Sequence, residues 1–205
     1  MTKQFSIVYG KRIKTILLIL AFYILPPIAI VLNWIPFSFR FILLTSVAPL
    51  MFFFRPSNHT KNIDLGITKR KLRESIFAII PITLLLALPI VILSLLNEPR
   101  VDNSGLSIYF YLFYVLISCP FQEFAYRGYL FHSLEILALG KWARIMIAAA
   151  LYSFVHIVYI DSYIVVSTLL AGILWNIHYD KFRNLASVTL SHSILGTLSI
   201  ILGLI

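Results

Sequence analysis

Seven apolar stretches, each near membrane-spanning length, follow one another along this chain of 205 residues. A helix needs about 20 apolar residues to cross a bilayer, and only helices or closed barrels satisfy their backbone hydrogen bonds there. Hydrophobic residues make up 60% of the chain and charged residues 12%, which leaves too little polar surface for a water-soluble domain. The sequence therefore predicts an all-α, polytopic integral membrane protein with about seven transmembrane helices, near residues 13–33, 37–54, 75–96, 106–132, 144–160, 163–178 and 184–205.

No internal repeat, low-complexity tract or linker separates these stretches, so we expect one transmembrane domain over residues 1–205. The first apolar run follows three basic residues and resembles a signal peptide. It continues to about Ile35 without a cleavage site of the A-x-A kind, which indicates a retained anchor. Cys119 is the single cysteine, which excludes an intramolecular disulfide.

The basic residues predict the orientation of the chain in the membrane. If the N-terminus is inside, fourteen of the seventeen Lys and Arg residues fall on inner segments, whereas Arg40 and Arg100 are outside and Arg127 lies within a span. This bias predicts a cytoplasmic N-terminus and an external C-terminus in the plasma membrane. The net charge of +9 is explained by this distribution, so we expect the lipid bilayer as a partner and no nucleic acid.

A carboxylate and a guanidinium interrupt the fourth apolar stretch, from Leu106 to Phe131. Glu123 and Arg127 are spaced i,i+4, which places them on one helix face within pairing reach. Charged side chains in hydrocarbon cost a few kcal/mol each and face a partner or a protein interior. His156 and His192 each lie in a later apolar stretch.

Helix geometry places these polar side chains at similar depths. At 1.5 Å per residue, Glu123 lies about 13 Å, His192 about 12 Å and His156 about 18 Å from the inner ends of their predicted helices. We therefore expect Glu123, Arg127, His156 and His192 to line one cavity, nearer the inner leaflet.

Three short motifs resemble those of CAAX-processing and bacteriocin-processing (CPBP, or Abi) intramembrane proteases. Residues 122–128, Gln-Glu-Phe-Ala-Tyr-Arg-Gly, are similar to the family's Glu-Glu-x-x-x-Arg motif. Residues 152–156, Tyr-Ser-Phe-Val-His, resemble Phe-x-x-x-His, and residues 192–196, His-Ser-Ile-Leu-Gly, resemble His-x-x-x-Asn. The resemblance covers about residues 106–205, the last four helices, and implies that the protease-like core lies there.

The resemblance also implies roles for the motif residues, and two of them are changed. In the family, the first glutamate of the pair and the second motif's histidine are thought to activate water, and the last motif's His and Asn to stabilise the oxyanion. These positions are Gln122, His156, His192 and Gly196 in this chain. Gln122 cannot act as a base and Gly196 offers no side-chain donor, although Asn176 is a candidate replacement. Arg127, Tyr126, Tyr152 and Gly196 are expected to support the site.

Three interpretations of the site remain open. Glu123 takes over as the base, with His156 orienting the water and His192, helped by Gln122, stabilising the oxyanion. Alternatively, the site is inactive, and this pseudoprotease binds a membrane-anchored partner. In the third, Glu123, His156 and His192 hold zinc; otherwise no cofactor is expected. A transporter is a more distant alternative, because no inverted repeat is seen.

We expect a membrane-embedded endopeptidase of the CAAX-processing type. Its substrate would be a membrane-associated protein or peptide, cleaved near the cytoplasmic leaflet.

Overall fold

The computed structural model describes residues 2–57 and 59–205, and this part of the chain contains helices and no strand. The fold class predicted from the sequence is confirmed. Five helical segments are long and apolar enough to cross a membrane, and two shorter apolar helices accompany them, Phe37–Phe53 and Leu185–Ile201. The protein is an all-α polytopic membrane protein.

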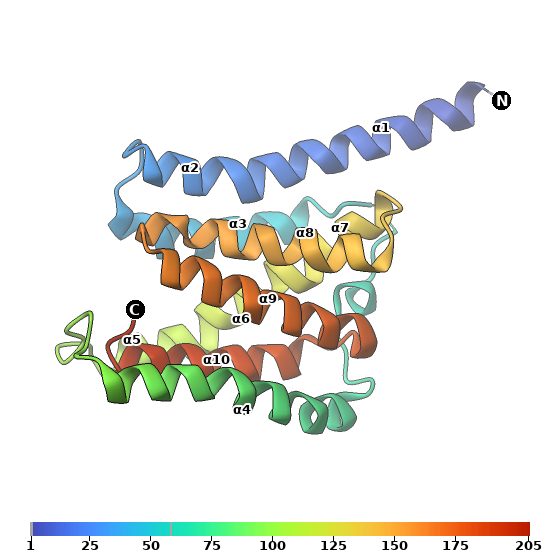
Figure 1. Ribbon diagram of the computed structural model, residues 1–205. Coiled ribbons are helices and arrows are strands. Elements are labelled where there is room, and N and C mark those ends of the chain that lie inside the picture. Colours follow the sequence, from blue (N-terminus) through green and yellow to red (C-terminus); the bar gives the residue numbers. More distant parts are fainter. Residues whose placement is uncertain (1, 58) are drawn as a thin grey trace.

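The seven helical segments lie roughly side by side, and α1 begins at the end of the bundle opposite to the end of α10 (Figure 1). Four segments are built from several consecutive elements. In chain order the elements are α1 (Thr2–Ile19), η1 (Leu20–Ile24) and α2 (Leu25–Val31); η2 (Phe37–Phe39) and α3 (Arg40–Phe53); the short η3 (Asn62–Leu65) in the loop before α4; α4 (Leu72–Leu96); α5 (Ile108–Phe113), η4 (Tyr114–Ser118), α6 (Cys119–Glu123), η5 (Phe124–Leu130) and α7 (Phe131–Ile136); α8 (Lys141–Phe154) and η6 (Val155–Tyr159); α9 (Ser162–Phe182); and α10 (Leu185–Ile201).

Several predicted boundaries were too short. The first helix begins at Thr2 rather than at residue 13, and the fourth continues to Ile136 rather than to 132. Hydropathy marks only the apolar part of a helix, whereas the backbone remains helical into the headgroup region. The last helix ends earlier than expected, at Ile201, because the chain turns at Gly203 in a left-handed conformation.

Two wide, π-helical stretches directly precede prolines inside membrane segments. The stretch η1 comes before Pro26 and Pro27, and η4 comes before Pro120. A proline ring clashes with the carbonyl of the residue four positions earlier and leaves that carbonyl without its usual donor. The wider turn shifts the bonds to an i→i−5 pattern, as in the bond of the Cys119 N–H to the Tyr114 carbonyl.

Helices α8, α9, α10, α4 and α6 are connected by a series of helix–helix contacts. Helix α8 packs on α9, α9 contacts α4 and α10, and α10 also contacts α4 and α6. The α8–α9 contact is close because Gly172 faces Ala149, whose Cα would lie 3.2 Å from a Cβ at position 172. Large apolar side chains such as Leu84, Leu95 and Leu116 remain exposed, as expected for a lipid-facing surface.

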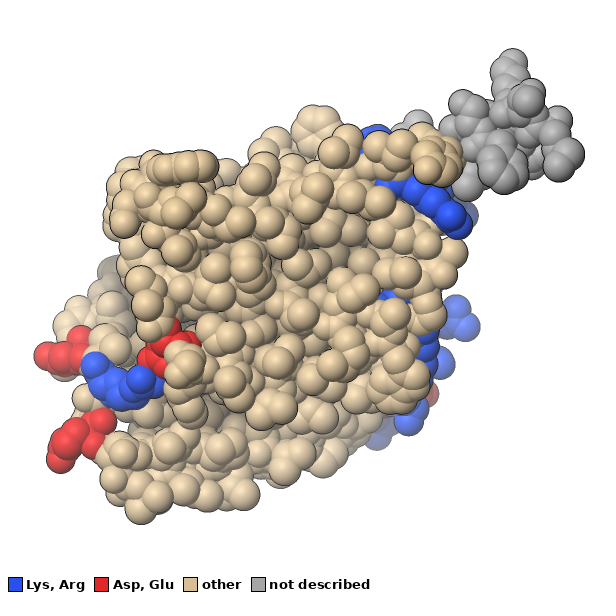
Figure 2. All heavy atoms as spheres, turned by 45° about the horizontal axis from the view of Figure 1, so that its top comes forward, with Lys and Arg blue, Asp and Glu red and all other residues tan. Residues whose placement is uncertain are grey.

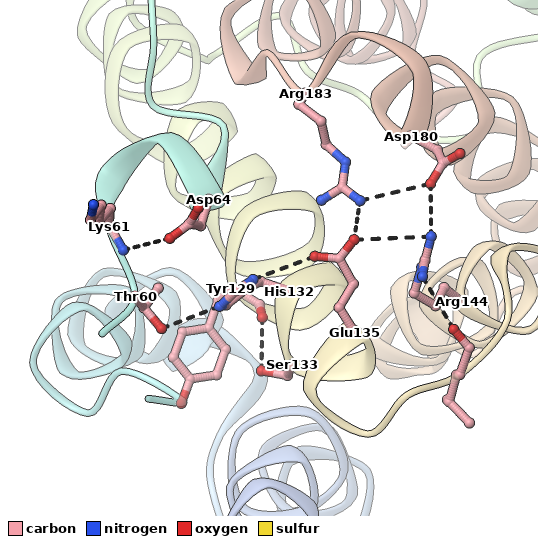
Figure 3. A network of polar contacts seen from close by, with 11 residues as sticks. Thr60, Lys61, Asp64, Tyr129, His132, Ser133, Glu135, Arg144, Asp180 and Arg183 are labelled. Atoms are coloured by element: carbon pink, nitrogen blue, oxygen red, sulfur yellow. Dashed lines mark hydrogen bonds and ion pairs between the residues drawn. The ribbon is translucent and has the colours of Figure 1, made fainter. Parts of the chain in front are cut away.

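Charged side chains gather at the two ends of the bundle, and the wide middle of the molecule is free of them in the view of Figure 2. A network of polar contacts joins four segments at one end (Figure 3). His132 contacts Thr60 and Glu135, and Glu135 in turn pairs with Arg144 and Arg183. This network fixes the loop before α4 against the ends of α7, α8 and α9.

Candidate active site

Glu123 and Arg127 form the predicted ion pair inside the bundle. Glu123 ends α6, and Arg127 lies in the π-helical stretch η5; both side chains are completely buried. The Arg127 Nη1 atom donates to Glu123 Oε1 over 3.2 Å. Stretches of π-helix are frequent at functional sites, and the i,i+4 spacing places both side chains on the same face of the helix.

His192 reaches the same carboxylate from α10. Its Nδ1 atom lies 2.7 Å from Glu123 Oε1, and the side chain is buried. Helix α10 is fixed two turns earlier by Asn184, whose side chain accepts from the Ala186 N–H and donates to the Thr68 and Arg70 carbonyls. The shared depth that helix arithmetic predicts for Glu123 and His192 is therefore present as a direct contact.

Two aromatic residues hold the charged groups in place. The Arg127 guanidinium lies 4.2 Å from the ring centroid of Tyr152 and 5.1 Å from that of Trp175. Trp175 also stacks on His192, with ring centroids 5.1 Å apart, and its Nε1 donates to Ser191. A desolvated cation over an aromatic face gains about 2 kcal/mol, which offsets part of the cost of burying Arg127.

Sequence reasoning did not identify Trp175 as part of the site. Tryptophan in a membrane helix belongs at the headgroup level, whereas Trp175 lies well inside α9 and is buried. In the span predicted from the sequence, 163–178, Trp175 stands three residues from the end, where a tryptophan is expected, so the hydropathy pattern carried no signal; α9 continues to Phe182.

His156 contacts Tyr152, which also contacts His192. Its Nδ1 lies 2.8 Å from the Tyr152 carbonyl oxygen, and its ring contacts the Tyr152 ring edge-to-face at 5.0 Å. Tyr152 contacts the His192 ring at 6.1 Å and the Tyr126 ring at 5.2 Å. Tyr152 thus stands between the two histidines, and His156 makes no hydrogen bond to Glu123 or His192 in the described chain.

Neither of the two altered motif positions makes a hydrogen bond to the carboxylate of Glu123 in the described residues. The Gln122 amide donates to Ser118 Oγ, one turn earlier on the same helix. Gly196 lies one turn beyond His192, and the hydroxyl of Tyr114 fills the space beside it. Asn176 donates to the Ile145 carbonyl and so joins α9 to α8, where it cannot replace the missing donor.

Several polar atoms of the ion pair remain without a protein partner. Glu123 Oε2 and the Nε and Nη2 atoms of Arg127 are buried and have no hydrogen-bond partner among the described residues. Buried polar groups are nearly always satisfied by protein or by water. The pair therefore offers one free acceptor and two free donors to a small polar molecule.

An apolar groove runs beside these residues. It has a volume of about 1120 Å³ and is bounded by α3, the loop before α4, the helix that carries Glu123, and α10. Phe124, which follows Glu123, and Ser193, which follows His192, both line it. Glu123, Arg127, His156 and His192 line neither this groove nor the polar pocket near the network of Figure 3, so the common cavity stays a prediction.

No group of three or more His, Cys, Asp and Glu side chains is arranged to hold a metal ion in residues 2–57 and 59–205. Glu123 and His192 touch, but the Nδ1 atom of His156 faces a backbone carbonyl.

One comparison with known proteins gives a match. The family model described as type II CAAX prenyl endopeptidase Rce1-like matches residues 104–198, the part of the chain that contains all the candidate residues. No curated protein and no solved structure matches the chain.

Proposed function

We propose that this membrane protein, whose residues 104–198 belong to the Rce1-like family of CAAX prenyl endopeptidases, is itself an active intramembrane endopeptidase. It hydrolyses a peptide bond of a membrane-associated protein or peptide near the cytoplasmic leaflet. The observation that carries the proposal is the buried carboxylate of Glu123, which is held on one oxygen by Arg127 and His192 and keeps the other oxygen free.

The proposed reaction begins with a water molecule that donates a hydrogen bond to Glu123 Oε2. The water oxygen attacks the scissile carbonyl carbon, its proton passes to Oε2, and the carbonyl oxygen becomes an oxyanion. When the tetrahedral intermediate collapses, the C–N bond breaks and the proton moves from Oε2 to the leaving amine. Arg127 and His192 keep the carboxylate in position through Oε1.

The apolar groove supports access of a membrane-anchored substrate. Its walls carry Phe52, Phe124 and Leu190, and its lining includes neighbours of both Glu123 and His192. An extended apolar or lipid-modified segment can lie in such a groove without exposing its backbone to acyl chains, because the groove walls shield it. No cofactor enters this scheme.

Cleavage of a defined peptide tests the proposal. The protein, reconstituted in lipid nanodiscs, is incubated with a farnesylated peptide that ends in a CAAX sequence and with the same peptide unprenylated. Mass spectrometry should detect a shortened peptide and the released C-terminal fragment. If neither peptide is shortened at any enzyme concentration that still shows binding, the chain is a binder and not a protease.

A pseudoprotease that binds a membrane-anchored partner is the second candidate, and two observations favour it. The first position of the glutamate pair is Gln122, whose amide is bonded to Ser118. In addition, Oε1 of the remaining carboxylate is already occupied by two donors.

Gln122→Glu separates the two candidates. A carboxylate at position 122 can accept from Ser118 in the same place, so the fold should be retained, and a second base becomes available one residue from Glu123. In an active protease, cleavage of the farnesylated peptide by this variant should be as fast as in wild type or faster. Cleavage by the variant together with none by wild type would assign the natural protein to the pseudoprotease class.

We infer that the chain resides in the plasma membrane with its N-terminus in the cytoplasm. The loop between α3 and α4 supports this, since it carries Arg55, Lys61, Lys69, Arg70 and Lys71. Each such charge near an anionic leaflet contributes about 1 kcal/mol.

Cysteine labelling of intact cells tests the orientation. Asn62→Cys lies in the basic loop and Ser104→Cys in the loop at the opposite end, and both positions are exposed. A membrane-impermeant maleimide should label Ser104→Cys and leave Asn62→Cys unmodified until the cells are permeabilised. The native Cys119 is buried and gives little background. Labelling of Asn62→Cys in intact cells would show that the basic loop lies outside and that the orientation is the opposite of the one inferred.

A further inference from the structure

The space beside Gly196 is occupied by a tyrosine hydroxyl from another helix. A Cβ atom built at Gly196 would overlap Tyr114 Oη and would lie 2.7 Å from Cζ and 2.9 Å from Cε1 of the same ring. Real Cβ atoms essentially never approach other heavy atoms within 3.0 Å. Any side chain at position 196 is therefore incompatible with Tyr114 in its present place.

Tyr114 shares its surroundings with His192. Gly196 follows His192 by four residues on α10, so the two positions lie on the same helix face. The rings of Tyr114 and His192 meet edge-to-face with centroids 6.3 Å apart. Tyr114 is 7% exposed, lies in the π-helical stretch η4, and stacks on Phe110, which fixes the direction of its ring.

We propose that Tyr114 is a catalytic residue whose O–H donates a hydrogen bond to the oxyanion of the hydrolytic intermediate. The inference rests on the proposed function and adds to it the donor that the changed motif lacks. The phenol of Tyr114 places an O–H group at the face of α10 next to His192, where Gly196 has no side chain that could donate a hydrogen bond. The glycine is required in turn, because only the absence of a Cβ leaves room for the phenol.

The chemistry at Tyr114 involves no bond making or breaking. Its proton stays on Oη throughout, and the hydrogen bond strengthens as negative charge develops on the carbonyl oxygen. A neutral donor placed in advance at such a position acts mainly on the transition state, and loss of one such donor typically costs about 100- to 1,000-fold in kcat.

The first experiment measures kcat and KM of Tyr114→Phe on the farnesylated peptide. Phenylalanine keeps the ring contacts with His192 and Phe110 and removes only the donor. We expect kcat to fall about 100- to 1,000-fold with little change in KM. Tyr109→Phe, an exposed tyrosine on the same helix, is the matched control and should behave as wild type.

An exchange of the donor between helices tests the geometry. Gly196→Asn alone should lower the melting temperature and the activity, because its Cβ collides with Tyr114. Tyr114→Ala removes the collision and the donor, and Tyr114→Ala combined with Gly196→Asn should regain both stability and part of the lost kcat. A double variant that melts no higher than Gly196→Asn would contradict the close approach of the two residues.

A transition-state analogue gives a measurement that does not require turnover. In this probe the scissile carbonyl of the farnesylated peptide is replaced by a tetrahedral phosphonate anion. Tyr114→Phe should weaken binding of the phosphonate by a factor comparable to the loss in kcat and should leave binding of the uncleaved peptide unchanged.

The outcomes separate the two proposals. If wild type cleaves and Tyr114→Phe keeps its kcat, Tyr114 is not the donor and the proposed function stands. If wild type cleaves nothing, the proposed function fails, and the phosphonate alone decides about Tyr114. Tighter binding of the phosphonate to wild type than to Tyr114→Phe supports an anion-binding hydroxyl there, whereas equal or absent binding overturns it.

Discussion

Glu123→Gln should reduce cleavage of the farnesylated peptide by about 100- to 10,000-fold, the range that a positioned general base contributes. Glutamine keeps the length of the side chain, and its carbonyl oxygen can still accept from Arg127 and His192. It cannot take a proton from water, and it places an NH₂ group where Oε2 now offers an acceptor. The loss should therefore appear in kcat with peptide binding close to that of wild type, whereas the melting temperature should fall, because the buried Arg127 loses its counter-charge.

Rates from purified protein in nanodiscs provide the measurement, with Glu98→Gln as the control. Glu98 is an exposed carboxylate in the loop after α4, and its replacement should leave the rate unchanged. A Glu123→Gln protein that cleaves at the wild-type rate would remove Glu123 from the role of base and would direct attention to His156.

Arg127→Met should cause the largest loss of stability of any single replacement considered. The guanidinium is completely buried, pairs with Glu123, and lies over two aromatic rings. Breaking a buried pair by removing one partner costs about 3–5 kcal/mol, because the other charge is left uncompensated. At the sensitivity typical of chains of this size, the melting temperature should fall by about 6–20 °C.

The melting curve of detergent-solubilised protein, followed by intrinsic fluorescence, measures this effect. Arg127→Met with Glu123→Gln should melt higher than Arg127→Met alone, since the second change removes the stranded carboxylate. Arg127→Lys keeps the charge but loses the planar contact with Tyr152 and Trp175, so an intermediate melting temperature is expected. A single Arg127→Met variant that melts like wild type would show that the ion pair is no structural clamp.

Hydropathy alone determined the membrane class and the number of apolar helices. Lipid requires that every backbone group be satisfied within its own segment, so each apolar run of about 20 residues has few alternatives to a helix. The i,i+4 pairing of Glu123 and Arg127 was also predictable, because it depends only on local helix geometry. Similar depths also predicted that Glu123 and His192 could meet, and in the structure they are in direct contact.

Only the tertiary structure decided which side chains meet around that pair. The rotation of each helix about its axis is not fixed by hydropathy, because lipid tails are as apolar as the protein interior. It is fixed instead by close contacts between helices, such as Gly172 with Ala149, and by the bonds of Asn184 to the loop before α4. These contacts place Trp175 on His192 and turn Asn176 toward α8, although both residues lie on the same helix.

The same reason explains why the tyrosine beside Gly196 could not be predicted from the sequence. In the sequence, Gly196 is a position without a side-chain donor, and Tyr114 is eighty-two residues away. Because α10 packs against η4, the missing side chain at position 196 leaves room for the phenol of Tyr114. The sequence determined that a polar group is buried in the membrane, and the packing of helices determined which donors surround it, because a packed interior leaves no space for two side chains in one place.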